Sequence, residues 1–154
     1  MSQVPDVIAS FLQGKRIAVA GVSRTGQSAG NPVLKKLRGA GYDAIPVNPH
    51  ASVIDGVPCY PDLARVPGRL DGVVIATHPK VAIDIVRQAS RRGVGAVWFH
   101  RSFGAGSAAE AAVEECRRLN ITAIVGGCPL MDCEPVDVVH RCMRAVLAWQ
   151  RRVP

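Results

Sequence analysis

The sequence predicts an α/β fold in which about five parallel strands form a doubly wound, Rossmann-like sheet with helices on both faces. Two observations lead to this prediction. Five short apolar runs are typical of buried strands, and amphipathic helical patterns lie between them. The run at 72–76 is apolar throughout, as strands are when both faces of a parallel sheet are covered. Because crossovers are right-handed, the order we expect is 3-2-1-4-5, with strands counted along the chain.

The first elements surround a glycine-bearing loop. Apolar residues at helical spacing predict a helix over 4–13 that packs beside the sheet as a lid. A strand at 17–20 follows, and the loop spans 21–30. Asn31 is expected to cap the next helix, with Pro32 at its first helical position.

The remaining elements repeat the alternation of buried strands and amphipathic helices. We expect further strands at 43–47, 72–76, 96–99 and 121–125. The helix that starts at Pro32 is expected to end at about residue 39. Further helices are expected at 80–92, 107–119 and about 135–149, with a helical turn at 62–65. The segment from 51 to 69 is rich in Pro and Gly and is expected to be mostly loop.

Length and composition suggest one domain over residues 1–154. A chain of 154 residues that is 48% apolar can bury a core of its own. It contains no apolar run near the ~20 residues that span a bilayer, and no basic start followed by an apolar stretch. We therefore expect a cytoplasmic protein without a membrane partner, and we leave open that it forms a homodimer.

Cysteine content and charge exclude several classes of protein. Five cysteines without C-x-x-C spacing argue against a disulfide framework or a zinc ribbon. A net charge of +7 fits a nucleic-acid partner, but the cations are dispersed along the chain. Two Trp, two Tyr and three Phe residues are few for a base-stacking surface. A polyanionic small molecule accounts for the charge equally well, and we expect no nucleic acid.

The loop after the first strand has the features of a phosphate site. A strand that leads through a glycine loop into a helix directs main-chain amides and the positive end of the helix dipole at one point. Gln27 stands where a Walker A loop needs lysine, and Ser23 replaces the second glycine of the dinucleotide pattern. The loop therefore fits a nucleotide phosphate of unspecified type, or an ordinary turn without a ligand.

In a sheet of this kind, the loops at the carboxyl ends of the strands meet over one crevice. We expect Gly21–Arg24, Asn48–His50 and Thr77–Lys80 to converge there. The end of the second strand lacks the carboxylate that holds the ribose of NAD, and Arg24, His50 and Lys80 make the site cationic. Such a site suits a ligand with a ribose phosphate and a pyrophosphate, and both NADP and coenzyme A fit.

Several motifs resemble a known family. They are I-A-V-A-G-V-S at 17–23, I-P-V-N-P at 45–49 and G-V-P-C-Y-P-D-L at 56–63, together with the Thr77-His78-Pro79 loop and Val97-Trp98. In these motifs the chain resembles the small stand-alone CoA-binding proteins, the YccU-like group, over most of residues 10–145. Their fold is similar to that of the CoA-binding domain of the succinyl-CoA ligase alpha subunit and of NDP-forming acyl-CoA ligases.

The resemblance implies a Rossmann-like domain that binds coenzyme A or an acyl-CoA. It implies that the CoA pyrophosphate is held by Gly21, Val22, Ser23 and Arg24. Asn48 and Pro49 would flank the adenosine end, with His50 beside them. The residues that would border the nucleotide are Thr77, His78, Pro79 and Lys80.

The residues do not indicate a reaction. The related ligases use a phosphorylated histidine and further domains, for which this chain has no room, and we assign no catalytic residue. A metal site at Cys128, Cys133, His140 and Cys142 is disfavoured because Cys142 falls on an apolar helical stripe. We assign no metal, and treat a mixed disulfide between Cys128 and CoA as a hypothesis.

Two alternatives to CoA binding stay open. One is an NADP-linked oxidoreductase or redox sensor, and the other is a nucleic-acid or protein interaction module.

Overall fold

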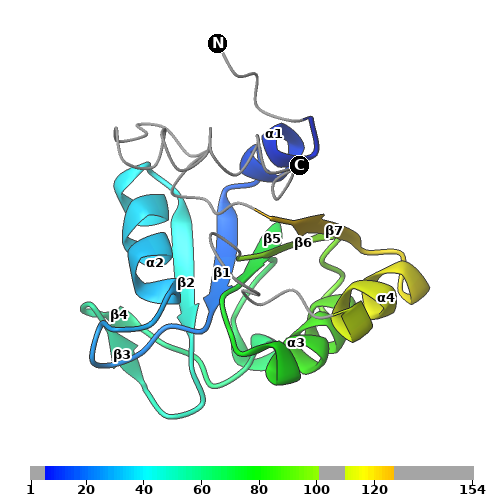
Figure 1. The fold of residues 1–154 in the computed structure, drawn as a ribbon. Coiled ribbons are helices and arrows are strands. Elements are labelled where there is room, and N and C mark those ends of the chain that lie inside the picture. The colour runs from blue at the N-terminus through cyan, green and yellow to red at the C-terminus, as the bar shows by residue number, and fades with distance from the viewer. Residues whose placement is uncertain (1–5, 101–109, 127–154) are drawn as a thin grey trace.

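The computed structural model describes residues 6–100 and 110–126 (Figure 1). The helices are α1 (Asp6–Leu12), α2 (Gly30–Gly39), α3 (Pro79–Arg91) and α4 (Glu110–Arg118), with a short 3-10 helix η1 (Leu63–Arg65). The strands are β1 (Arg16–Ala20), β2 (Asp43–Val47), β3 (Val53–Ile54), β4 (Val57–Pro58), β5 (Gly72–Ile75), β6 (Ala96–Phe99) and β7 (Thr122–Val125). The helix expected at 135–149 lies outside these residues.

The sheet confirms the α/β Rossmann-like class and corrects the predicted strand order. Five parallel strands lie in the order β2-β1-β5-β6-β7, which is 2-1-3-4-5 along the chain, so the expected 3-2-1-4-5 is wrong. β5 pairs with β1, with Gly72 opposite Ile17. The outer side of β2 is already occupied at its carboxyl end, because Tyr60 forms a parallel bridge with Val47 there. The third long strand therefore joins the sheet on the other side of β1.

The segment between β2 and β5 contains a hairpin that we did not predict. β3 and β4 pair antiparallel. Asp55 and Gly56 connect them with positive φ angles of 50° and 75°, the backbone twist that tight hairpin turns require. This small hairpin packs beside α2, and the chain then passes through η1 and crosses to β5 (Figure 1). The expected helical turn at 62–65 is confirmed as η1.

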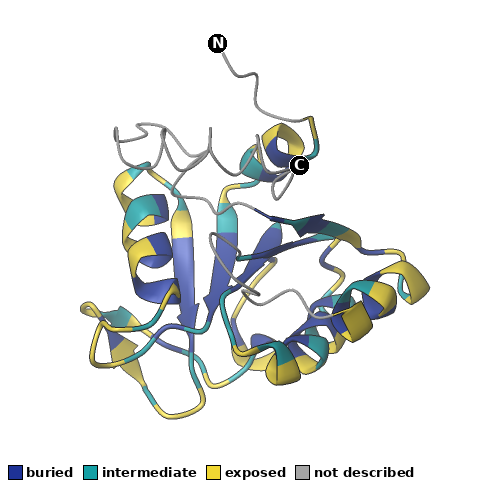
Figure 2. Cartoon of the chain, viewed as in Figure 1, coloured by how far each residue is buried: buried dark blue, intermediate teal, exposed yellow. Residues whose placement is uncertain are grey.

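Helices cover both faces of the sheet, as predicted. Side chains alternate along each strand, so Ile17 and Val19 pack with α1 and α2, whereas Ala18 and Ala20 pack with α3 and α4. Strands β1, β2, β5 and β6 are largely buried between these layers, the edge strand β7 is less so, and many exposed residues lie on the outer helix faces and loops (Figure 2). β5 is buried along its whole length, which suits the central place it takes.

The predicted first helix forms and packs beside the sheet. α1 lies at the end of the sheet where β1 begins (Figure 1). The Phe11 ring meets Trp98 edge to face, with ring centroids 5.6 Å apart and planes at 84°. A side chain at Gly72 would come within 2.6 Å of the Phe11 ring, so this contact requires glycine. α1 therefore closes the core at the amino ends of the strands.

The strand order fixes where a ligand crevice lies. From β1 the chain passes through α2 to β2 on one side, and β5 lies on the other side and leads into α3 on the opposite face. The switch point is thus at the carboxyl ends of β1 and β5. In the part of the chain that the structure describes, no helix has the length and apolarity needed to cross a bilayer.

Candidate functional site

The turn after β1 requires glycine at two positions. Gly21 has a φ of 97°, and a Cβ there would lie 2.3 Å from the Ala76 carbonyl oxygen at the end of β5. Gly30 begins α2 directly against this turn, and a Cβ there would lie 2.6 Å from the Gly21 carbonyl oxygen. The same oxygen accepts a 2.5 Å hydrogen bond from the Ser28 hydroxyl. The two glycines thus bring the end of β1, the end of β5 and the start of α2 into backbone contact.

Asn31 holds this loop in place and does not cap α2. Its Oδ1 accepts hydrogen bonds from the Ser23 amide at 2.8 Å and from the Ser28 hydroxyl at 2.6 Å. Its Nδ2 donates to the Ser23 carbonyl oxygen at 2.8 Å. The helix begins at Gly30, two residues before the expected Pro32, and Ala29 before it has no capping side chain. The prediction of an Asn31 cap is wrong because this buried amide satisfies both polar groups of Ser23 instead.

Asn48 joins the loop after β2 to the loop after β1. Its Nδ2 donates to the Val22 carbonyl oxygen at 2.7 Å, and its Oδ1 accepts from the His50 amide at 2.6 Å. The expected convergence of 21–24 and 48–50 is therefore confirmed. Both ends of the Asn48 side chain are used in this structural link, a role that sequence reasoning missed because it depends on contacts between distant segments.

The loop after β5 also reaches this site. The close approach of Gly21 to Ala76 and Thr77 places the start of this loop beside the turn after β1, and residues 78–80 lead from there into α3. His78 caps α3, because its Nδ1 accepts a hydrogen bond from the Lys80 amide at 3.2 Å while Pro79 occupies the first turn. The sequence signal for this cap was the His-Pro pair directly before an amphipathic helix.

The amide groups of the first loop are not all equivalent. The Ser23 amide is occupied by Asn31, whereas those of Val22, Arg24 and Thr25 have no acceptor within residues 6–100 and 110–126. The Ser23 hydroxyl lies 3.2 Å from that of Thr25. The loop therefore offers main-chain donors held by a fixed frame, which is the arrangement that suits an anion.

The surrounding charge is cationic. Arg24, His50 and Lys80 are exposed around the converging loops. The end of β2 carries no carboxylate, as the sequence indicated. His100 lies at the end of the neighbouring strand β6, and its amide donates to the Ile75 carbonyl oxygen at 2.8 Å. Burial lowers the pKa of the His100 imidazole, so it is neutral near pH 7.

The two described cysteines, Cys59 and Cys116, are free and buried. Burial raises the pKa of the Cys59 thiol, which lies behind Asn48, 3.9 Å from its carbonyl oxygen. Burial also raises the pKa of Cys116, to about 11, so both are thiols at neutral pH. Cys128 and the other residues considered for a metal site lie outside the described ranges.

These features define a Rossmann-like α/β protein with a glycine turn and open amides at the switch point of its sheet. Comparison with known proteins identifies the family. The chain belongs to the CoA binding domain family, whose model matches residues 15–134.

Similar proteins include long CoA ligases and a small protein of about this size. Acetate–CoA ligase [ADP-forming] II of Archaeoglobus fulgidus is 32% identical over 61% of this chain and 14% of the ligase. A trans-feruloyl-CoA synthase from an unknown prokaryotic organism is 33% identical over 74% of this chain and 16% of the synthase. The chain thus spans only a small part of these relatives. A hypothetical protein from Pyrococcus horikoshii OT3 superimposes with a TM-score of 0.70 at 26% identity, covering 80% of this chain and 89% of that protein.

Proposed function

We propose that this protein binds coenzyme A or an acyl-CoA in the crevice at the carboxyl ends of β1, β2 and β5, and that it catalyses no reaction by itself. The observation that carries the proposal is the turn after β1. The amides of the exposed residues Arg24 and Thr25 have no acceptor within residues 6–100 and 110–126, and Asn31 and Asn48 hold the loop that carries them in place. A cradle fixed before the ligand arrives binds an anion without the entropic cost of ordering a loop.

The pyrophosphate of CoA suits the segment Gly21–Arg24. The amides of Arg24 and Thr25 belong to the loop that leads into the positive end of the α2 dipole, and the exposed Arg24 guanidinium adds a full charge. Ser23 contributes its hydroxyl, because Asn31 already uses the Ser23 amide.

The other two loops suit the adenosine end of the ligand. The Asn48 side chain is hydrogen-bonded to the main chain of Val22 and His50. Its role in ligand binding is therefore to position Pro49 and His50. Thr77, His78, Pro79 and Lys80 border the opposite side of the crevice, where Lys80 is exposed and cationic. A ribose phosphate, which CoA has and NAD lacks, is compatible with these cations and with the missing carboxylate after β2. The names of the two long relatives, a ligase and a synthase, also contain CoA.

Calorimetry and thermal shift with CoA, acetyl-CoA, NADPH, NADH and ATP test the proposal. A ligand at 100 times its dissociation constant adds ~2.7 kcal/mol to the free energy of unfolding. We expect CoA and acetyl-CoA to stabilise the protein and NADH to have little effect. Tight NADPH binding with weak CoA binding would instead identify an NADP-linked protein.

The variant Ser23→Asp places a negative charge in the cradle and should abolish CoA binding. Ser10→Asp adds the same charge on the exposed face of α1, at the other end of the sheet, and should leave CoA binding unchanged. If Ser23→Asp binds CoA as well as the wild type, the turn after β1 is not the binding site.

A further inference from the structure

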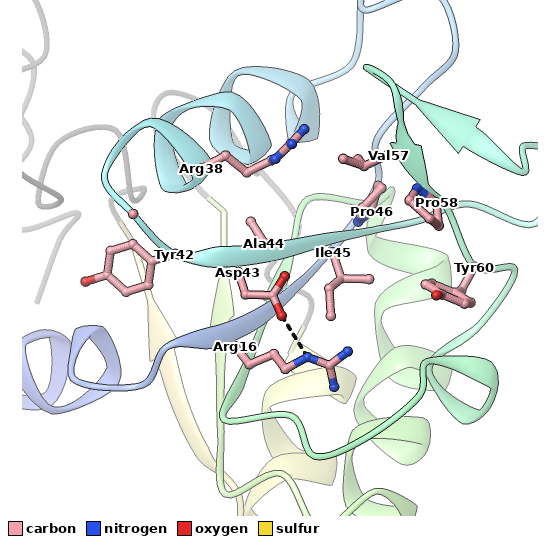
Figure 3. A pocket seen from close by; sticks show the side chains of 11 residues that line it. Arg16, Arg38, Tyr42, Asp43, Ala44, Ile45, Pro46, Val57, Pro58 and Tyr60 are labelled. Atoms are coloured by element: carbon pink, nitrogen blue, oxygen red, sulfur yellow. Dashed lines mark hydrogen bonds and ion pairs between the residues drawn. The ribbon is translucent and has the colours of Figure 1, made fainter.

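A groove separate from the crevice runs along the outer edge of β2 (Figure 3). It encloses about 580 Å³, and its lining includes Arg16, Arg38, Tyr42, Pro46, Pro58 and Tyr60. A smaller hollow of about 240 Å³ shares Arg38 and adds Leu34, Lys35 and Asp55, so the concave surface continues between α2 and the β3–β4 hairpin. The residues proposed to bind CoA, at 21–24, 48–50 and 77–80, do not line either hollow.

The floor of the groove is the outer edge of β2, whose residues from Ala44 to Val47 are largely covered by the groove walls. β2 is the last strand on its side of the sheet, and hydrogen-bonding groups alternate between its two sides. The Asp43 amide points inward to Lys15, whereas the Pro46 carbonyl oxygen points outward and accepts a hydrogen bond from the Tyr60 amide at 3.1 Å. Ala44 follows the outward alternation. Its amide and carbonyl groups therefore face the groove, and Pro46 has no amide proton to offer.

The walls differ in character. Arg38 extends from α2 above β2, and its exposed side chain makes no ion pair with the residues that the structure describes. Arg16 below the strand is already paired with Asp43 at 2.9 Å. Pro58 and Tyr60 form an apolar wall at the carboxyl end (Figure 3). The groove thus presents the outward amide and carbonyl groups of Ala44, the exposed Arg38 guanidinium and an apolar surface.

We propose that this groove binds an extended, acidic segment of a partner protein by strand addition. The main chain of the segment pairs with Ala44, a carboxylate pairs with Arg38, and an apolar side chain packs on Pro58 and Tyr60. The charge favours an acidic partner over a second copy of this chain, because a two-fold pairing of β2 edges would bring two Arg38 side chains together in a protein of net charge +7.

Fluorescence polarisation with a labelled peptide of alternating Glu and Val tests this proposal. A peptide of alternating Lys and Val is the matched control. We expect only the acidic peptide to bind, more weakly at high salt because the contact is partly electrostatic. Excess CoA should not displace the peptide, so this result does not depend on the proposed CoA site. Failure of the acidic peptide to bind even at low salt would overturn the proposal.

Two pairs of variants separate the backbone contact from the charge contact. Ala44→Pro removes the outward amide while leaving the β1–β2 hydrogen bonds intact, as Pro46 already does, and Ala44→Ser keeps the amide at nearly the same size in this buried position. Arg38→Glu reverses the charge in the groove, and Arg91→Glu does so on the exposed face of α3. We expect Ala44→Pro and Arg38→Glu each to weaken acidic-peptide binding about tenfold or more, and their controls to have little effect.

The charge reversal keeps the test decisive if Ala44→Pro does not fold. Arg38→Glu should gain binding to the peptide of alternating Lys and Val, which the wild type does not bind. Equal losses in Arg38→Glu and Arg91→Glu would mean that only net charge matters, and would contradict the site. A wild-type dimer that Ala44→Pro dissociates would mean that a second copy occupies the groove, which also overturns the proposal.

Discussion

Asn31 holds the peptide groups of Ser23 from both sides, with 2.8 Å hydrogen bonds to its amide and to its carbonyl oxygen. The Asn31 side chain is buried, and it also accepts from the Ser28 hydroxyl. One residue at the start of α2 therefore fixes the shape of the turn that we propose as the CoA site. Asn31 therefore has two expected roles, to stabilise the fold and to shape the CoA site, and substitutions can separate them.

Asn31→Ala and Asn31→Asp should rank in opposite orders for stability and for CoA affinity. Alanine loses the side-chain hydrogen bonds to Ser23 and Ser28 and should lower the free energy of unfolding by ~1–3 kcal/mol. Aspartate keeps the acceptor for the Ser23 amide and the Ser28 hydroxyl, so it should be more stable than alanine. Its charge faces the proposed pyrophosphate site, so it should bind CoA less well than alanine does. Urea unfolding and calorimetry measure the two orders, and the same order in both would contradict the proposed site.

Gly21→Ala should destabilise the protein far more than Gly26→Ala. Both glycines have positive φ angles, of 97° and 73°. A Cβ at Gly26 would meet no atom within 4 Å, so only the backbone preference is lost, which costs about 1 kcal/mol. A Cβ at Gly21 would overlap the main chain at Ala76, which cannot move without disturbing β5. Chemical denaturation of the two variants measures the difference, and equal losses would show that the turn can relax.

The sequence was sufficient to predict the elements that depend on local patterns. The apolar run at 72–76 and the helical spacing of 80–92 appear in the structure as β5 and α3 with nearly the same limits. The meeting of 21–24 with 48–50 also followed, because parallel strands align their carboxyl ends.

The errors have a different cause, since each depends on a contact between segments that are far apart. The strand order depends on Tyr60, which occupies the outer side of β2 at its carboxyl end, and nothing in the local pattern of Pro and Gly residues around Tyr60 indicates this contact. Asn before Pro is a helix-start signal and predicts an Asn31 cap, but Ser23, eight residues earlier, competes for the Asn31 side chain. The roles of Asn31 and Asn48 thus require the folded loop.

Arg92→Lys should destabilise the segment between β4 and β5, which contains η1. The Arg92 guanidinium donates to the carbonyl oxygens of Leu63 at 2.8 Å and of Val66 at 2.6 Å, and also reaches that of Gly68. One lysine ammonium cannot span this set of acceptors, so we expect a loss of ~2 kcal/mol in the free energy of unfolding. Arg91→Lys is the control, because Arg91 is the exposed neighbour on α3. Equal unfolding midpoints for the two variants would contradict this role.

Glu115 should make stability depend on acid pH. Hydrogen bonds from Arg118 and then Arg87 lower the pKa of the Glu115 carboxyl from 4.5 to about 2. The carboxylate thereby joins α4 to α3, with Arg87 Nε 3.0 Å and Arg118 Nη2 2.6 Å from Oε1. Because the folded pKa lies below the unfolded one, this contribution is present above about pH 4.5 and is lost as the pH falls towards 2.

Glu115→Gln should therefore be less stable than the wild type at pH 7, and the difference should shrink between about pH 4.5 and pH 2. Glu114→Gln removes an exposed carboxylate that pairs with Arg117 on the same helix, and should change stability little at any pH. Urea unfolding of the three proteins across this pH range measures the effect. A Glu115→Gln curve that stays parallel to the wild type down to pH 2 would mean that Glu115 has an ordinary pKa in the folded protein, and that the link between α3 and α4 is not ionic.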